Sequence, residues 1–199
     1  MGKCSGRSVA LLGLTISLFE ITPAPAANPS KLAARERRYC RRQGGEVQTR
    51  VPTFGTNNPE EELPLNGTRQ FCRFTSPTDG THIFVGLETL AAQQPTLAAL
   101  AYLTRPQVSN IPPAVNPASF YCSGLGGSDL FGGMNVVAGG GWLEAHDKDV
   151  PVLQACVFPD QSVIDSFGIF YHANGIVRGV DLTSSFAYQS DNPPFVFGN

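Results

Sequence analysis

The chain has few charged residues and lacks the short motifs that mark common classes of enzyme. Charged residues make up 15% of its 199 residues and the formal net charge is −2. It therefore carries no strong field of one sign, and we expect no general affinity for nucleic acid. It contains no G-x-S-x-G, H-E-x-x-H or G-K-[ST] motif, so no nucleophile elbow, zinc helix or phosphate loop is predicted. We expect no cofactor.

Close pairs of cysteines are also missing. Four of the five cysteines follow the first 26 residues, and each lies more than 30 residues from the next. A zinc site typically uses close C-x₂-C pairs, so we expect no bound metal. An even number of cysteines in an exported protein instead predicts disulfides, formed by Cys40, Cys72, Cys122 and Cys156.

Residues 1–26 have the pattern of a cleaved secretory signal. Lys3 and Arg7 precede an apolar run over 9–19, and Ala24-Pro25-Ala26 supplies the small residues that a signal peptidase recognises. The apolar run is shorter than the roughly 20 residues that span a bilayer, and no later stretch is long enough. We therefore predict export to a periplasmic or extracellular compartment, with no transmembrane span after cleavage. Cleavage would remove two of 14 basic and one of 16 acidic residues, leaving a formal net charge of −3.

Two short motifs occur twice in the same order. Y-C-x-x-x-G-G occupies residues 39–45 and 121–127, and Q-x-C-x-F occupies residues 70–74 and 154–158. The cysteines of the two motifs are separated by 32 residues in the first copy, from 40 to 72, and by 34 in the second, from 122 to 156. Matched motifs at matched spacing predict two tandem units.

The predicted units are residues 28–103 and residues 116–199. The stretch 104–115 between them holds several prolines and polar residues, which is typical of an extended linker. Four cysteines allow three pairings. Because a duplicated unit should carry its own bridge, we predict that Cys40 pairs with Cys72 and Cys122 with Cys156.

The second unit has the local signals of a helix followed by strands. Asn116 can cap a helix, Pro117 suits its first turn, and the glycine pair allows the left-handed turn that ends it. After the second cysteine, Ser162 can start a short helix or strand, and residues 176–182 alternate partly like a strand. The sequence thus predicts an α+β fold of two tandem small units, each a helix packed on a short antiparallel sheet and held by a disulfide.

Three segments of the second unit match the pattern of a known family in order. They are N-P-A-S-F-Y-C at residues 116–122, the glycine pair at 126–127, and C-V-F-P-D at 156–160. Residues 116–175 thereby resemble a small cysteine-containing bacterial domain of unknown function, whose members are often labelled hemolysins and are typically exported; the first copy keeps only part of the pattern. Ile164 stands where the family has a further cysteine. The resemblance implies an exported domain and supplies no activity.

Basic residues gather near the start of the first unit. Four of them recur at helical spacing and would form one stripe: Lys31, Arg35, Arg38 and Arg42. Such a stripe could bind an anionic partner such as a polysaccharide or a lipid headgroup. The alternative, which we favour from sequence, is an exposed helix face whose charge is balanced by the acidic run Glu60-Glu61-Glu62.

His146 and His172 are the candidate acid–base residues. His146 lies in the charged stretch 144–149, and His172 follows two aromatic residues, so either could take part in proton transfer. Neither recurs in the other copy. Hydrolysis also requires a nucleophile, a base and charge stabilisation in one place, and no motif joins such residues here.

We therefore expect a non-catalytic binding or interaction protein of the periplasm or cell envelope. Its partner would be an envelope or extracellular protein or a polysaccharide, recognised by loops such as 52–68 and 132–149, because rigid frameworks commonly carry function on loops. One alternative is a secreted hydrolase that uses His146 or His172. Another is a structural component of the envelope.

Overall fold

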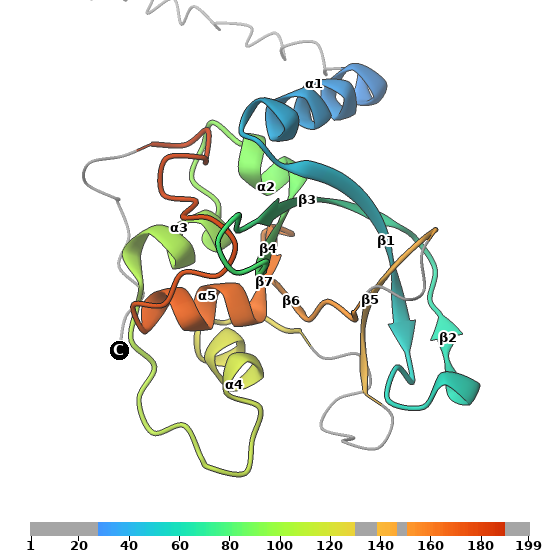
Figure 1. Ribbon diagram of the computed structural model, residues 1–199, viewed down its shortest axis with the longest axis vertical. Coiled ribbons are helices and arrows are strands. Elements are labelled where there is room, and N and C mark those ends of the chain that lie inside the picture. Colours follow the sequence, from blue (N-terminus) through green and yellow to red (C-terminus); the bar gives the residue numbers. More distant parts are fainter. Residues whose placement is uncertain (1–27, 130–138, 147–150, 190–199) are drawn as a thin grey trace, which may run out of the picture.

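The chain forms an α+β fold in which helices pack on one antiparallel sheet (Figure 1). The computed structural model describes residues 28–129, 139–146 and 151–189. The predicted signal, residues 1–26, and part of the predicted recognition loop, residues 132–149, lie outside the described residues. The helices are α1 (Pro29–Arg42), the 3₁₀ helix η1 (Pro59–Glu61), α2 (Leu87–Ala91), α3 (Leu97–Thr104), α4 (Pro117–Gly124) and α5 (Ser166–Ala173). The strands are β1 (Glu46–Phe54), β2 (Leu63–Pro64), β3 (Arg69–Thr75), β4 (His82–Gly86), β5 (Gly140–Glu144), β6 (Ala155–Val157) and β7 (Val163–Asp165).

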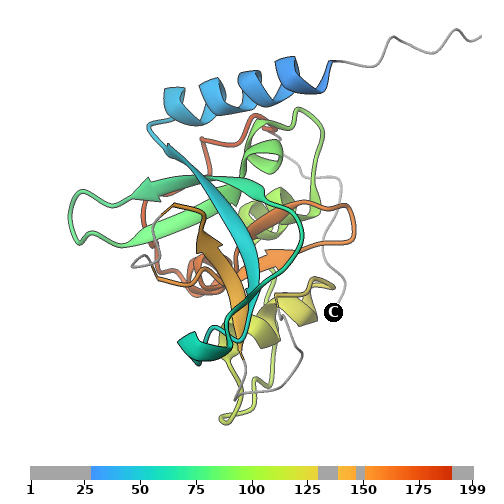
Figure 2. The ribbon, with the colours of Figure 1, turned by 90° about the vertical axis from the view of Figure 1, so that its right-hand side faces the viewer.

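In the described residues six strands follow the order β2-β1-β3-β4-β7-β6, and the seventh, β5, pairs with β1 outside this path. Residues 46–50 of β1 pair with β3, and residues 50–54 pair with β5. Trp142 in β5 also forms an antiparallel bridge with Leu153. The backbones of these two residues exchange hydrogen bonds of 2.8 and 3.0 Å. Leu153 lies just before β6, so the two ends of the sheet approach each other. The sheet therefore curls around a concave face (Figure 2).

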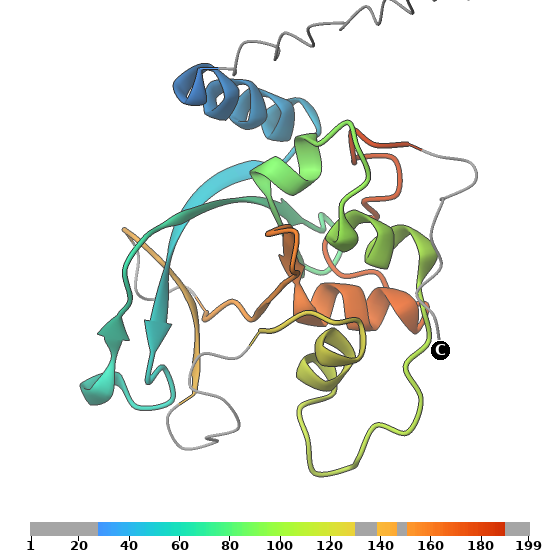
Figure 3. The same cartoon turned by 180° about the vertical axis from the view of Figure 1, so that it is seen from behind.

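A row of side chains across four strands defines the opposite, helix-side face of the sheet. Cys72 of β3 is paired with Val85 of β4, Val85 with Ile164 of β7, and Ile164 with Cys156 of β6. All four residues are fully buried in the larger hydrophobic cluster, beneath the helices (Figure 3). Because successive side chains of a strand point to opposite faces, the residues next to this row face the concave side. A smaller hydrophobic cluster lies there, formed by Phe71, Phe84, Trp142, Leu153, Ala155 and Val163.

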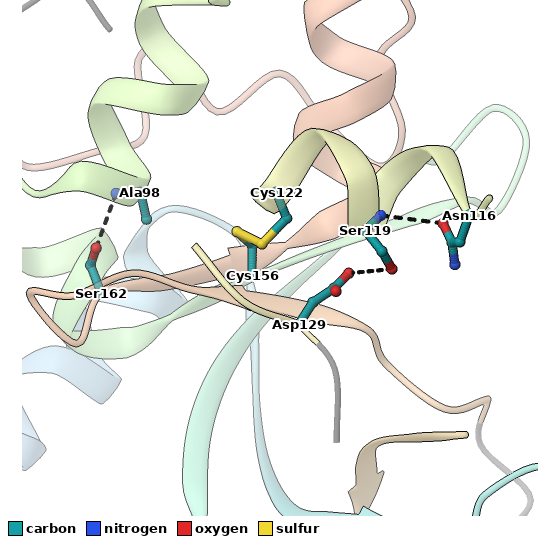
Figure 4. The surroundings of a disulfide bond; sticks show 7 residues. All are labelled: Ala98, Asn116, Ser119, Cys122, Asp129, Cys156 and Ser162. Carbon is teal, nitrogen blue, oxygen red and sulfur yellow. Dashed lines mark hydrogen bonds between the residues drawn. A yellow bond between two sulfur atoms is a disulfide. The ribbon is translucent and has the colours of Figure 1, made fainter. Parts of the chain in front are cut away.

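Both predicted disulfides are confirmed. Cys40 is bonded to Cys72 and Cys122 to Cys156, and each bridge joins the last turn of a helix to a strand of the sheet. The Cα atoms are 5.7 Å apart in each bridge, within the usual range. Figure 4 shows the second bridge between α4 and β6. The four sulfur atoms lie in the helix-side core.

The glycine pair of the repeated motif has a specific role beside each bridge. The first glycine adopts a left-handed conformation, with φ of +84° at Gly44 and +79° at Gly126, which glycine adopts without the steric penalty of other residues. The second glycine lies against the sulfurs: a Cβ at Gly45 would collide with Cys72 Sγ, and one at Gly127 with Cys156 Sγ. The motif therefore ends the helix and leaves room for the disulfide.

An asparagine caps the start of both α1 and α4, and the cap at Asn116 was predicted. The side chain of Asn28 accepts a hydrogen bond from the backbone N–H of Ser30, and that of Asn116 accepts from Ala118 and Ser119. Ser119 then donates its hydroxyl to the buried Asp129 carboxylate at 3.0 Å (Figure 4), and burial raises the pKa of Asp129. These contacts fix α4 to the segment that follows it.

The two predicted units contribute to a single sheet, not to two separate sheets. Strands of the two units pair in two places: Val85 of β4 with Ile164 of β7, and residues 50–54 of β1 with residues 140–144 of β5. Residues 105–115 between the units contain no helix or strand, as the proline content predicts. The hydroxyl of Tyr121 donates to the carbonyl of Pro106 at 2.7 Å, so this connection is tied to α4. That the two segments are repeats of one unit stays a prediction.

Two local expectations for the end of the chain are wrong. Asp165, not Ser162, caps α5, because its carboxylate accepts from the Gly168 N–H at 2.9 Å. Ser162 instead accepts the N–H of Ala98 at 3.0 Å (Figure 4). Residues 176–182 do not form a strand. Within them Gly179 has a φ of +69°, and its backbone N–H donates a hydrogen bond to the Thr81 hydroxyl. No helix in the described part of the chain has the length and apolar character needed to span a membrane.

Candidate functional site

A cavity of about 610 Å³ opens on the concave side of the sheet. Side chains from β1, β3, β4, β7 and α5 line it, together with segments 151–154 and 176–178. The lining is mostly apolar. Its ionisable side chains include three arginines, a histidine and a carboxylate: Arg50, Arg73, Arg178, His82 and Asp165. Apolar walls with a few convergent polar groups are typical of small-molecule sites.

Arg50 forms the deepest charged part of the cavity lining and is 0% exposed. Its Nη1 donates to the carbonyls of Trp142 and Pro151 at 2.9 and 3.2 Å, and its Nη2 donates to Gln48 Oε1 at 3.0 Å. The guanidinium carbon lies 4.5 Å from the centre of the Phe84 ring. Burial lowers the pKa of Arg50, yet arginine stays protonated in proteins. All of these hydrogen-bond partners are neutral. Within the described part of the chain no carboxylate lies at ion-pair distance from Arg50, although the charges of Glu144 and Asp165 act to raise its pKa.

Arg73 is the more accessible cation, and His82 positions it. Arg73 Nη2 donates to His82 Nε2 at 2.7 Å, and His82 Nδ1 lies 3.0 Å from Thr75 Oγ1. Because Nε2 accepts from the guanidinium, we assign the imidazole proton to Nδ1, which donates to the threonine hydroxyl. Burial and the neighbouring arginines lower the pKa of His82, so it is neutral at pH 7. Arg73 keeps 24% of its side chain exposed, and Glu46 approaches it at 3.7 Å from the solvent side.

An aromatic and aliphatic wall lies beside the third cation. The guanidinium carbon of Arg178 is 5.5 Å from the centre of the Tyr171 ring, which stacks on Phe167 at 6.2 Å. Val152 and Ile176 also line the cavity and are 38% and 52% exposed. The site thus places a positive charge next to apolar surface, which suits a ligand with an anionic group and an apolar body.

Asp165 is the only carboxylate that lines the cavity in the described part of the chain. It is 5% exposed and already serves as the cap of α5. Burial raises the pKa of Asp165 to about 6, although the hydrogen bond from Gly168 and the charges of Arg178 and Arg50 oppose that shift. At pH 7 the carboxylate is mostly ionised and offsets part of the charge of the three guanidinium groups. Glu46, which pairs with Arg73, and Glu144, whose charge acts on Arg50, lie outside the lining. The lining itself therefore carries more cationic than anionic groups.

The predicted basic stripe lies elsewhere, on the outer surface of α1. Its four members are exposed and none lines the cavity: Lys31, Arg35, Arg38 and Arg42. The acidic run that we expected to balance them does not lie beside them. Glu60 and Glu61 belong to η1, which follows the far end of β1 (Figure 1). A nine-residue strand spans roughly 30 Å, so the expected charge balance is wrong.

The two predicted acid–base histidines do not line the cavity either. His146 is exposed just after β5. His172 is 2% exposed and stacks on Tyr102, with ring centres 3.7 Å apart and planes inclined by 8°. Its Nε2 lies 3.8 Å from Asp181 Oδ1, but burial outweighs that attraction and lowers the pKa of His172. His172 thus packs as a neutral ring in the core.

None of the charged residues that line the cavity was predicted from the sequence. Arg50, Arg73, Asp165 and Arg178 come from separate segments, so no local motif joins them. One signal was available in the motif Q-x-C-x-F. Strand alternation sends the cysteine and phenylalanine to one face, so Arg73, which lies between them, must face the other side with Phe71.

Comparisons with known proteins add no family to this description. No protein-family model, curated protein or solved structure matches the chain. The resemblance of residues 116–175 to the cysteine-containing bacterial domain therefore stays a prediction. The cavity is interpreted from its own geometry and charge.

Proposed function

We propose that the protein is a non-catalytic, extracytoplasmic binding protein whose cavity takes a small ligand with one anionic group and an apolar body. The observation that carries this proposal is that three guanidinium groups and one carboxylate line a partly enclosed, largely apolar cavity. Arg50 is fully buried without a carboxylate at ion-pair distance in the described residues, and burying such a charge is costly. An anion in the cavity would offset that cost, with Arg73 and Arg178 able to contact it and Arg50 acting through its charge from below.

The state of the ionisable groups favours binding over hydrolysis. Both nitrogens of His82 are engaged by Arg73 and Thr75, and the Asp165 carboxylate caps α5. A general base must reach the proton that it removes, and these contacts occupy the two candidates in the cavity. Two disulfides favour an oxidising compartment, which supports export.

Calorimetric titration with phenyl phosphate, inorganic phosphate and phenol tests the proposal. We expect phenyl phosphate to bind more tightly than either fragment, because it combines an anion with an aromatic ring. Replacing both accessible cations, Arg73→Gln with Arg178→Gln, should weaken binding by at least about tenfold, since a charged hydrogen bond contributes about 1.5–3 kcal/mol. Arg38→Gln on α1 removes a distant exposed charge and should leave the affinity unchanged.

Two outcomes would contradict the cavity as an anion site. One is equal affinity for phenol and phenyl phosphate, which would show that the charge is not recognised. The other is an unchanged affinity in the double arginine variant. Circular dichroism of that variant distinguishes a lost contact from a lost fold.

A further inference from the structure

Helix α1 is attached to the rest of the protein along one side. Cys40, its only buried residue, is bonded to Cys72. Arg37 donates a hydrogen bond of 3.1 Å to Gln70 Oε1 in β3. The hydroxyl of Tyr39 donates one of 3.1 Å to the backbone carbonyl of Ser185. The opposite side of the helix lies on the outside of the molecule (Figures 1 and 2).

That outer side carries a straight line of cations. At 100° per residue, Lys31, Arg35, Arg38 and Arg42 fall within a sector of about 60°, centred directly opposite Cys40. Successive members are separated by rises of about 4.5–6 Å along the axis, and the line is about 16 Å long. All four side chains are exposed.

No member of the line of cations forms an ion pair within the described part of the chain. The nearest acidic residue along the helix, Glu36, lies beside the hollow between α1 and α2 with Glu88. Burial and the charge of Glu88 raise the pKa of Glu36, so this carboxylate belongs to the inner side of the helix. Arg35 borders the same hollow, and its charge opposes the rise in the pKa of Glu36.

We propose that this face of α1 binds a linear acidic polysaccharide, independently of the cavity. A line of charges suits a polymer that lies along the helix and repeats its anionic groups at about the length of one sugar ring. A membrane surface fits less well, because interfacial helices bury a broad apolar face and Leu32 is the one large apolar side chain exposed on α1. The formal net charge of −2 also disfavours nucleic acid.

Binding to polygalacturonate, measured at low and high salt, tests the proposal. We expect affinity to fall as salt rises, because bound cations release counterions from the polymer. The triple variant Arg35→Gln, Arg38→Gln and Arg42→Gln should weaken binding by at least tenfold at low salt. Glutamine is a good helix former, so the helix should persist, which circular dichroism checks.

Two matched variants separate charge from other effects. Lysine at the same three positions keeps the charge and should keep the affinity within about threefold of the original. Arg41→Gln removes an exposed cation that lies about 80° away from the stripe around the helix and should have little effect.

Unchanged binding in the triple glutamine variant would overturn the proposal. So would tighter binding to vesicles that contain phosphatidylglycerol, or to a single-stranded oligonucleotide, than to polygalacturonate. The cavity variant Arg73→Gln with Arg178→Gln should bind the polymer like the unmodified protein. Failure of the cavity proposal and failure of this one are therefore separate results.

Discussion

The two faces of the sheet differ in what the repeated motif places on them. On the helix-side face, Cys72 and Phe74 of the first copy and Cys156 and Phe158 of the second are all almost completely buried in one core. They are the cysteine and the phenylalanine of the motif Q-x-C-x-F, which the two copies share together with the glutamine. The helix-side face is thus built twice from the same side chains.

The concave face carries the variable positions of the same motif. They are Phe71 and Arg73 in the first copy and Ala155 and Val157 in the second. Arg73 lines the cavity, whereas Phe71, Ala155 and Val157 pack in the smaller hydrophobic cluster. The shared cysteine and phenylalanine therefore hold the framework together, and one variable position of the first copy contributes a cation to the candidate site.

Removing a disulfide from the helix-side core should give the largest loss of stability among these predictions. Replacing both cysteines of one bridge by serine, at Cys40 and Cys72 or at Cys122 and Cys156, should lower the free energy of unfolding by about 3–4 kcal/mol in the chain-entropy model. Because both bridges lie in one core, each loss should shift a single cooperative transition. Denaturant unfolding followed by circular dichroism measures it, and a loss below about 1 kcal/mol would contradict a major role for the bridges.

Alanine substitutions at the two glycines beside each disulfide should lower stability by smaller amounts, which differ between the two positions. Gly45→Ala places a Cβ against the buried Cys72 sulfur and should cost about 2–3 kcal/mol by overpacking. Gly44→Ala meets no atom within 4 Å and should cost only the left-handed backbone penalty of about 1 kcal/mol. The matched pair Gly127→Ala and Gly126→Ala should repeat this order. Equal costs within a pair, measured by thermal unfolding, would show that contact with the sulfur is unimportant.

The smallest predicted effect is the pH dependence of ligand affinity at the cavity on the concave face. Asp165 has its pKa raised to about 6, so it loses its negative charge as the pH falls from 7.5 to 5. Affinity for benzenesulfonate, which keeps its charge over this range, should therefore increase about three- to tenfold, as expected for removing one nearby like charge. Calorimetry at several pH values measures the change.

Asp165→Asn supplies the control for that prediction. Asparagine can still cap α5 but does not titrate, so the increase between pH 7.5 and 6 should disappear. The same raised pKa means that the folded state holds the proton more tightly than the unfolded chain, whose aspartate titrates near 3.9. The contribution of Asp165 to stability should therefore grow as the pH falls through 6 towards 4. An affinity that decreases with falling pH would contradict the role given to Asp165.

Local signals in the sequence predicted local features well. The cap at Asn116, the glycine turns and the disulfide pairing depend on residues close together or on matched motifs, and all agree with the structure. The start of α5 was misplaced, because Ser162 and Asp165 are both suitable caps and packing of Ser162 against Ala98 decides between them. The sequence alone is compatible with His172 in a functional site or in the core. In the structure its ring stacks on Tyr102 in the core.

The α+β framework could be predicted from the sequence, because capping and turns depend on neighbouring residues and the disulfide pairing follows from motifs that occur twice. Only the tertiary structure decided where the candidate site lies. Arg50, Arg73, Asp165 and Arg178 meet because the sheet curls until Trp142 pairs with Leu153. That curl depends on the pairing of distant strands and on the face to which each side chain points, and no stretch of neighbouring residues encodes it.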